Sequence, residues 1–159
     1  MQRFLLYALA GLSAIGLLLS ITSHLSSLVG LVGPLGDHTW LLPLGIFIVW
    51  VPSVIVAHQL KKGVSGEPFW EFVLRGCPPW MRFMFYGFSV YAFVNFALFL
   101  LAIALHKSPI TGAMLPARMV REFSGIWMAF YAAALVILYS GSTLLNGRTR
   151  HYHSRITIG

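Results

Sequence analysis

Residues 80–105 read WMRFMFYGFSVYAFVNFALFLLAIAL, and Arg82 near the start is the only charged side chain among them. About 20 predominantly apolar residues in one helix are enough to cross the hydrocarbon core of a bilayer. This run is therefore long enough and apolar enough to span a membrane. It predicts an integral membrane protein rather than a water-soluble domain.

Three further apolar runs flank this one and predict spans at 4–24, 40–60 and 122–145. Together the four runs predict an all-α integral membrane protein, a four-transmembrane-helix bundle with residues 1–159 as a single transmembrane domain. A basic tail, 146–159, follows the last span, is polar and shows no helical period. The connection from His106 to Arg121 contains Pro109, Gly112 and Pro116 and predicts an irregular loop.

Pro52 lies near the middle of the second span. A proline there removes a backbone hydrogen bond and crowds the carbonyl of Ile48, so we expect a kink. In lipid the freed carbonyl needs another donor, which we expect from Ser53 or from a neighbouring helix.

The connection between the second and third spans predicts a short amphipathic helix of one or two turns. Phe69, Phe72 and Val73 would face inward, while Glu71 and Arg75 form an i,i+4 pair toward water. Such a helix is expected in the plane of the lipid headgroups.

The composition supports a membrane protein: 58% of the 159 residues are hydrophobic and 9% are charged, against about 25% charged residues in a soluble domain. The net charge is +7, but the basic residues lie between the apolar runs, where they would meet anionic lipid headgroups. The chain is therefore expected to contact the lipid bilayer and no nucleic acid.

The distribution of Lys and Arg predicts the orientation, because an even number of spans places both termini on one side. One side would hold Arg3, Lys61, Lys62, Arg75, Arg82, Arg148, Arg150 and Arg155, and the other Lys107, Arg118 and Arg121. Eight basic residues against three predict a multi-pass protein of the cell membrane with both termini in the cytoplasm.

Candidate binding residues are few, and no catalytic constellation or metal motif is present in the sequence. On the predicted outer side His24, His38 and His106 lie near three helix ends and offer imidazole ligands to copper or haem, although their spacing matches no motif. Asn95 and Tyr91 share a ridge of the third span with Gly87, which favours helix packing through a hydrogen bond over a contact with a quinone. The sequence leaves the cofactor open.

Cys77 is the only cysteine, so an intrachain disulfide is excluded. An inert thiol is one interpretation. A reactive thiol, with its pKa lowered by the nearby Arg75 and Arg82, is the other.

The absence of Asp, Glu, Lys and Arg from the middle of the spans argues against an ion-coupled transporter. The sequence predicts a non-catalytic accessory or structural subunit of a larger membrane protein complex, with other membrane subunits or further copies of itself as partners. Pairs of small residues four positions apart, such as Gly16 and Ser20, fit close helix contacts, either within the bundle or with a partner. The alternatives are a haem- or quinone-associated redox membrane protein and a small transporter or channel.

Overall fold

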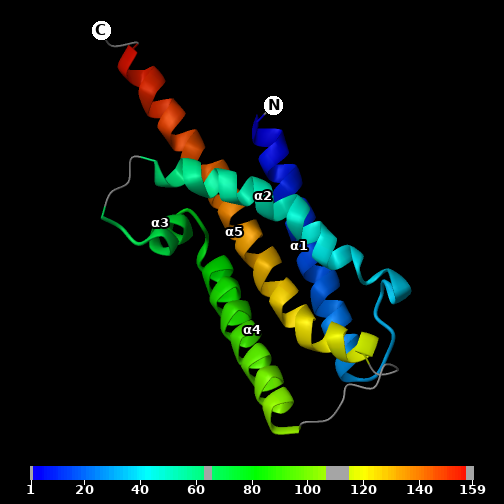
Figure 1. Cartoon of the computed structure of the whole chain (residues 1–159). Helices are drawn as coiled ribbons and strands as arrows, with labels where there is room; N and C mark the ends of the chain where they lie inside the picture. Colours follow the sequence, from blue (N-terminus) through cyan, green and yellow to red (C-terminus); the bar gives the residue numbers. More distant parts are fainter. Residues whose placement is uncertain (1, 63–65, 107–114, 157–159) are drawn as a thin grey trace.

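The structure is a computed structural model that describes residues 2–62, 66–106 and 115–156 (Figure 1). The described part of the chain contains helices and no strand, in the order α1 (Gln2–Leu28), the 3-10 turn η1 (Gly36–His38), α2 (Leu41–Lys61), α3 (Phe69–Arg75), α4 (Pro79–His106) and α5 (Leu115–Ile156). Four segments are long and apolar enough to cross a membrane: Phe4–Leu28, Gly36–Lys61, Pro79–Leu105 and Phe123–Leu144. The predictions of an all-α fold and of four such helices are confirmed.

The central helix is α5, which packs against α1, α2, α3 and α4. Figure 1 shows it running between α1 on one side and α4 on the other. Ala132, Ala134, Val136 and Leu138 in its middle are completely buried. The helices α1, α2, α3 and α4 are therefore each held in place by a contact with α5.

The contact between α1 and α5 is close because the facing residues of α1 are small. A Cβ atom at Gly16 would lie 2.2 Å from Cε1 of Tyr131, so only glycine leaves room for that ring. Ser13 and Ser20 are buried on the same face, and each hydroxyl donates to a carbonyl of its own helix, Leu9 O at 2.9 Å and Gly16 O at 2.8 Å. Small residues with satisfied hydroxyls let two helix backbones approach each other in this way.

Two apolar clusters fill the space between the described helices. One joins α2 and α3 to α5 through residues such as Leu60, Val73 and Leu138. The other joins the beginning of α2 to α5 and includes Leu42 and Tyr131. The hydroxyl of Tyr131 donates to the carbonyl oxygen of Leu42 at 2.7 Å, so the buried phenol is also satisfied.

The length of α5 corrects two predictions. The helix begins at Leu115, within the segment predicted as an irregular loop, and continues to Ile156, through most of the segment predicted as a non-helical tail. Its 42 residues correspond to about 63 Å, roughly twice the hydrocarbon thickness. Pro116 is compatible with a first helical turn, which needs no amide donor. After Asn146 the chain contains no proline, so a helix already formed in the apolar segment propagates onward.

Ser53 behaves differently from the prediction for α2. Its hydroxyl donates to the carbonyl of Val49, four positions earlier, at 2.7 Å. It does not donate to the carbonyl of Ile48, which lacks an amide donor because residue 52 is proline. The helix continues through Pro52 to Lys61. The local geometry of a buried serine, which reaches the carbonyl at i−4, decided the partner.

The short helix between α2 and α4 is confirmed as α3, with Val73 buried and Phe69 and Phe72 packed against the same cluster. The ion pair differs from the prediction: Arg75 pairs with Glu67 and not with Glu71. Glu67 lies just outside the first turn of α3 and is partly shielded, whereas Glu71 is left exposed on the helix.

Candidate functional site

Three helices meet at the side chain of His24, which is only 4% exposed. Its Nδ1 atom lies 2.7 Å from Oγ of Ser124 on α5. Its Nε2 atom forms a short hydrogen bond with the hydroxyl of Tyr91 on α4. The imidazole therefore connects α1 to α4 and α5 within a candidate membrane span.

The hydrogen bonds assign one consistent set of protons to this cluster. Ser124 donates its hydroxyl proton to the carbonyl of Arg121 at 3.2 Å, so toward His24 its oxygen acts as an acceptor. Nδ1 of His24 then carries the proton that it donates to Ser124, and Nε2 accepts from Tyr91. A neutral imidazole satisfies every one of these bonds, and this lowers the cost of burying it.

A glycine of α5 makes room for the α4 side of the cluster. A Cβ atom at Gly125 would lie 3.2 Å from Nδ2 of Asn95 and 3.6 Å from Cε1 of Tyr91. Both candidate residues of the predicted ridge therefore face α5. Gly87, the third member of that ridge, is exposed, and a Cβ atom there would meet nothing within 4 Å.

The three candidate histidines have different environments. His24 is buried with both ring nitrogens engaged, so it could coordinate a metal or haem iron only by giving up one of its hydrogen bonds. His38 is exposed in η1. His106 is the last residue of α4, and its side chain lies outside the described part of the structure. Among the described residues, no group of three or more His, Cys, Asp or Glu side chains could hold a metal ion.

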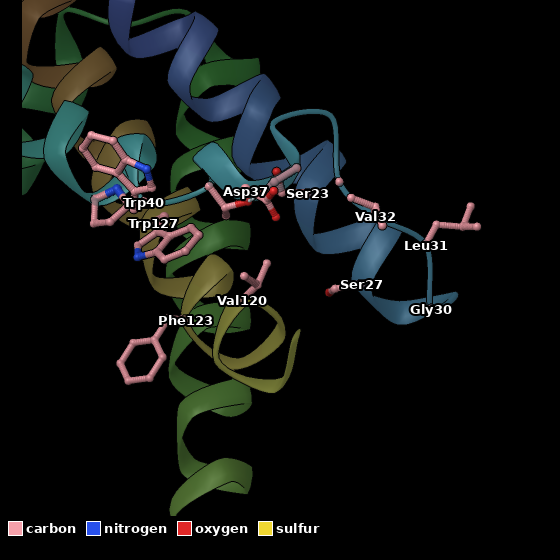
Figure 2. Close-up of a pocket in the computed structure, with 14 residues that line it drawn as sticks. Ser23, Ser27, Gly30, Leu31, Val32, Asp37, Trp40, Val120, Phe123 and Trp127 are labelled. Carbon is pink, nitrogen blue, oxygen red and sulfur yellow. Dashed lines mark hydrogen bonds between the residues drawn. The ribbon is translucent and has the colours of Figure 1, made fainter. Parts of the chain in front are cut away.

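A cavity of about 720 Å³ lies beside this cluster, where the connection from α1 to α2 meets the beginning of α5 (Figure 2). The volume falls within the range of about 300–1,000 Å³ that is typical of small-molecule sites. Its lining is formed by Ser23, Ser27, Gly30, Leu31, Val32, Gly33, Gly36, Asp37, Thr39, Trp40, Pro43, Val120, Phe123 and Trp127.

The cavity has an aromatic part and a polar part. Figure 2 shows the rings of Trp40 and Trp127 near each other, with Phe123 beyond them, and Ser23 and Asp37 together in another part of the site. Asp37 is the one charged residue among the described residues of the lining. Ser23 is 1% exposed, and its Oγ atom has no hydrogen-bond partner among the described residues.

Sequence reasoning missed Ser124 and the whole cavity. The sequence of α1 contained a signal for the contact that includes Ser124. Small residues recur there every three or four positions and so share one helix face: Ser13, Gly16, Ser20, Ser23 and Ser27. His24 adjoins that face. The cavity had no comparable signal, because its lining joins two stretches of the chain, 23–43 and 120–127, that are far apart in sequence.

Cys77 lies outside the candidate spans, between α3 and α4, and is buried. Burial raises the pKa of its thiol from the ordinary 9.0 to about 11, although the charge of Arg82 acts in the opposite direction. The thiol donates to the carbonyl of Val136 on α5 at 3.5 Å. The interpretation of Cys77 as a reactive thiol with a lowered pKa is therefore wrong: desolvation outweighs the nearby guanidinium, and Arg75 is paired with Glu67.

Comparison of the chain with protein-family models, with curated proteins and with solved structures gives no match. The candidate site is therefore interpreted from its own residues.

Proposed function

We propose that the chain is a non-catalytic accessory subunit of a larger membrane protein complex, with its four apolar helices inserted in the cell membrane as a bundle. The observation that carries this proposal is an outward face of α4, here called the α4 seam. All its members are exposed: Phe83, Gly87, Val90, Val94, Ala97, Leu101 and Ala104.

The spacing of the α4 seam places its residues on one face of the helix. Its residues follow one another at alternating intervals of four and three, the heptad spacing that lets two helices pack side by side. Three of them are small, and small residues allow close approach of helix backbones in a membrane. Phe85 and Ala92 are buried on the opposite face of the same helix. The seam thus supports contact with a helix from outside this chain.

The arrangement of the ends supports a contact on the cytoplasmic side. The beginning of α1 and the last turns of α5 lie at the same end of the molecule, and α5 extends beyond the other helices there (Figure 1). The sequence of that extension carries Arg148, Arg150 and Arg155. An excess of Lys and Arg is typical of the cytoplasmic side, so we place both termini in the cytoplasm.

The two alternatives receive less support from the described residues. A transporter needs a polar path between helices, whereas apolar clusters occupy that space on both sides of Trp50. A haem protein that uses His24 would need one of its ring nitrogens, and both are engaged, while His38 lies exposed in η1, outside the buried cluster. Neither observation conflicts with an accessory subunit.

The test is purification of the chain from its native membranes in a gentle detergent, followed by mass spectrometry of the intact assembly. We expect a stoichiometric partner, either a different subunit or further copies of this chain, which the mass distinguishes. The variant Ala97→Trp places a bulky side chain in the α4 seam and should release that partner.

Leu100→Trp is the matched control, because Leu100 is 51% exposed in the same turn of α4 but lies outside the α4 seam. This variant should retain the partner. A wild-type chain that always purifies as a stable monomer would overturn the proposal, and so would equal loss of the partner in both variants.

A further inference from the structure

The cavity beside the His24 cluster has a chemical character opposite to that of the whole chain. The chain carries a net charge of +7, yet among the described residues that line the cavity there is no Lys or Arg, and the carboxylate of Asp37 is their one charged group. Asp37 is exposed, and none of the ion pairs among the described residues involves it. Within the described part of the chain, the cavity therefore presents a carboxylate without a cationic partner.

Aromatic rings add to the attraction for a cation. Trp40 and Trp127 contribute indole faces to the lining, and Phe123 contributes a phenyl ring (Figure 2). Tryptophan provides the strongest cation–π attraction of the natural side chains, but Asp37 lies in a different part of the lining from the two tryptophans (Figure 2), so the carboxylate is the group that would face the charge. The same rings would contact an apolar body attached to the cation.

Ser23 supplies an independent indication that the cavity accommodates a ligand. Its hydroxyl is buried and unpartnered within the described residues, while the hydroxyls of Ser27 and Thr39 in the same lining donate to the carbonyls of His24 and Gly36. A buried hydroxyl without a partner destabilises the fold. A bound molecule with a polar head would remove that destabilisation.

From these observations we infer that the cavity binds a cationic amphiphile, an organic ammonium or similar cation carrying an apolar group, with Asp37 facing the charge and the tryptophans contacting the body. The inference is independent of the accessory role, since the α4 seam lies on another helix from every residue of the cavity. Failure of one proposal leaves the other standing.

Two ions of nearly the same shape and opposite charge provide the test. Tetraphenylphosphonium and tetraphenylborate are each dialysed to equilibrium against the full chain in an uncharged maltoside detergent, with detergent alone as the blank. We expect saturable binding of the phosphonium at one site. The borate should only partition, as it does in detergent alone.

Asp37→Asn should weaken phosphonium binding about tenfold or more, because it removes the charge and keeps the shape. Glu71→Gln is the matched control, since Glu71 is an exposed acid on α3 outside the cavity, and it should bind like the wild type. Unchanged thermal unfolding of Asp37→Asn shows that the variant is folded. Equal saturable binding of both ions, unchanged binding by Asp37→Asn, or no binding by the wild type would each overturn the inference.

A short-chain quinone serves as a competitor that carries no charge. We expect little displacement of the phosphonium by the quinone. Displacement from the wild type, together with undiminished quinone binding by Asp37→Asn, would show a site for neutral quinones and would also overturn the inference.

Discussion

The contact of α1 with α5 and the outward face of α4 use the same kind of residues in opposite surroundings. A Cβ atom added at Gly16 would collide with the ring of Tyr131, whereas one added at Gly87 would meet nothing within 4 Å. The first glycine serves contacts within the chain, and the second has none there. A pattern of small residues therefore predicts helix contact without saying whether the partner belongs to the same chain.

The largest effect on stability is expected at the contact of α1 with α5. Gly16→Ala should lower the free energy of unfolding by about 1–3 kcal/mol, because the new methyl group overlaps the Tyr131 ring, which is itself buried. The measurement is unfolding by SDS in mixed maltoside micelles. Gly11→Ala is the control, since Gly11 is exposed on the same helix with open space around it, and its stability should be unchanged or slightly raised. Equal effects at both positions would contradict the close contact of α1 with α5.

A smaller loss is expected where α5 holds α2. Tyr131→Phe removes the hydroxyl that donates to the Leu42 carbonyl at 2.7 Å and should cost about 1 kcal/mol in the same assay. Tyr139→Phe is the control at a half-buried phenol of the same helix. A cost for Tyr139→Phe as large as that for Tyr131→Phe would argue that the ring environment, and not the bond to Leu42, determines the result.

A still smaller effect is expected for the hydrogen bond that joins α4 to α1. We expect a double-mutant cycle of His24→Ala and Tyr91→Phe to give a coupling energy of about 0.6 kcal/mol, the average for hydrogen bonds between membrane helices. The cycle subtracts the effects of each substitution alone. A coupling energy of zero would mean that α4 is held by its contact with α5 without help from His24.

The sequence predicts the helices well and their partners poorly. Length and apolarity alone placed the segment 80–105 within a residue or two of the candidate span Pro79–Leu105, because a membrane-spanning helix satisfies its own backbone. Which side chains pair depends on which faces meet in three dimensions. The sequence therefore predicts Glu71 as the partner of Arg75, although the ion pair forms with Glu67. The same reason explains the missing cavity, whose lining combines residues as far apart as Ser23 and Trp127.

Cys77 lies between α3 and α4 and packs against α5. At neutral pH the titration of its thiol should leave the free energy of unfolding unchanged. Because its pKa is raised from 9.0 to about 11 in the folded chain, its contribution to stability is fully present below pH 9.0 and is lost as the pH rises toward about 11. The unfolded chain loses its proton first in that window, so alkali favours unfolding. The unfolding free energy of the wild type should therefore fall relative to that of Cys77→Ser between pH 9 and about 11, while the difference between the two stays constant from pH 6 to 8. Parallel curves throughout would mean that the thiol is solvated, and that the junction between α3 and α5 is looser than the 3.5 Å bond to Val136 indicates.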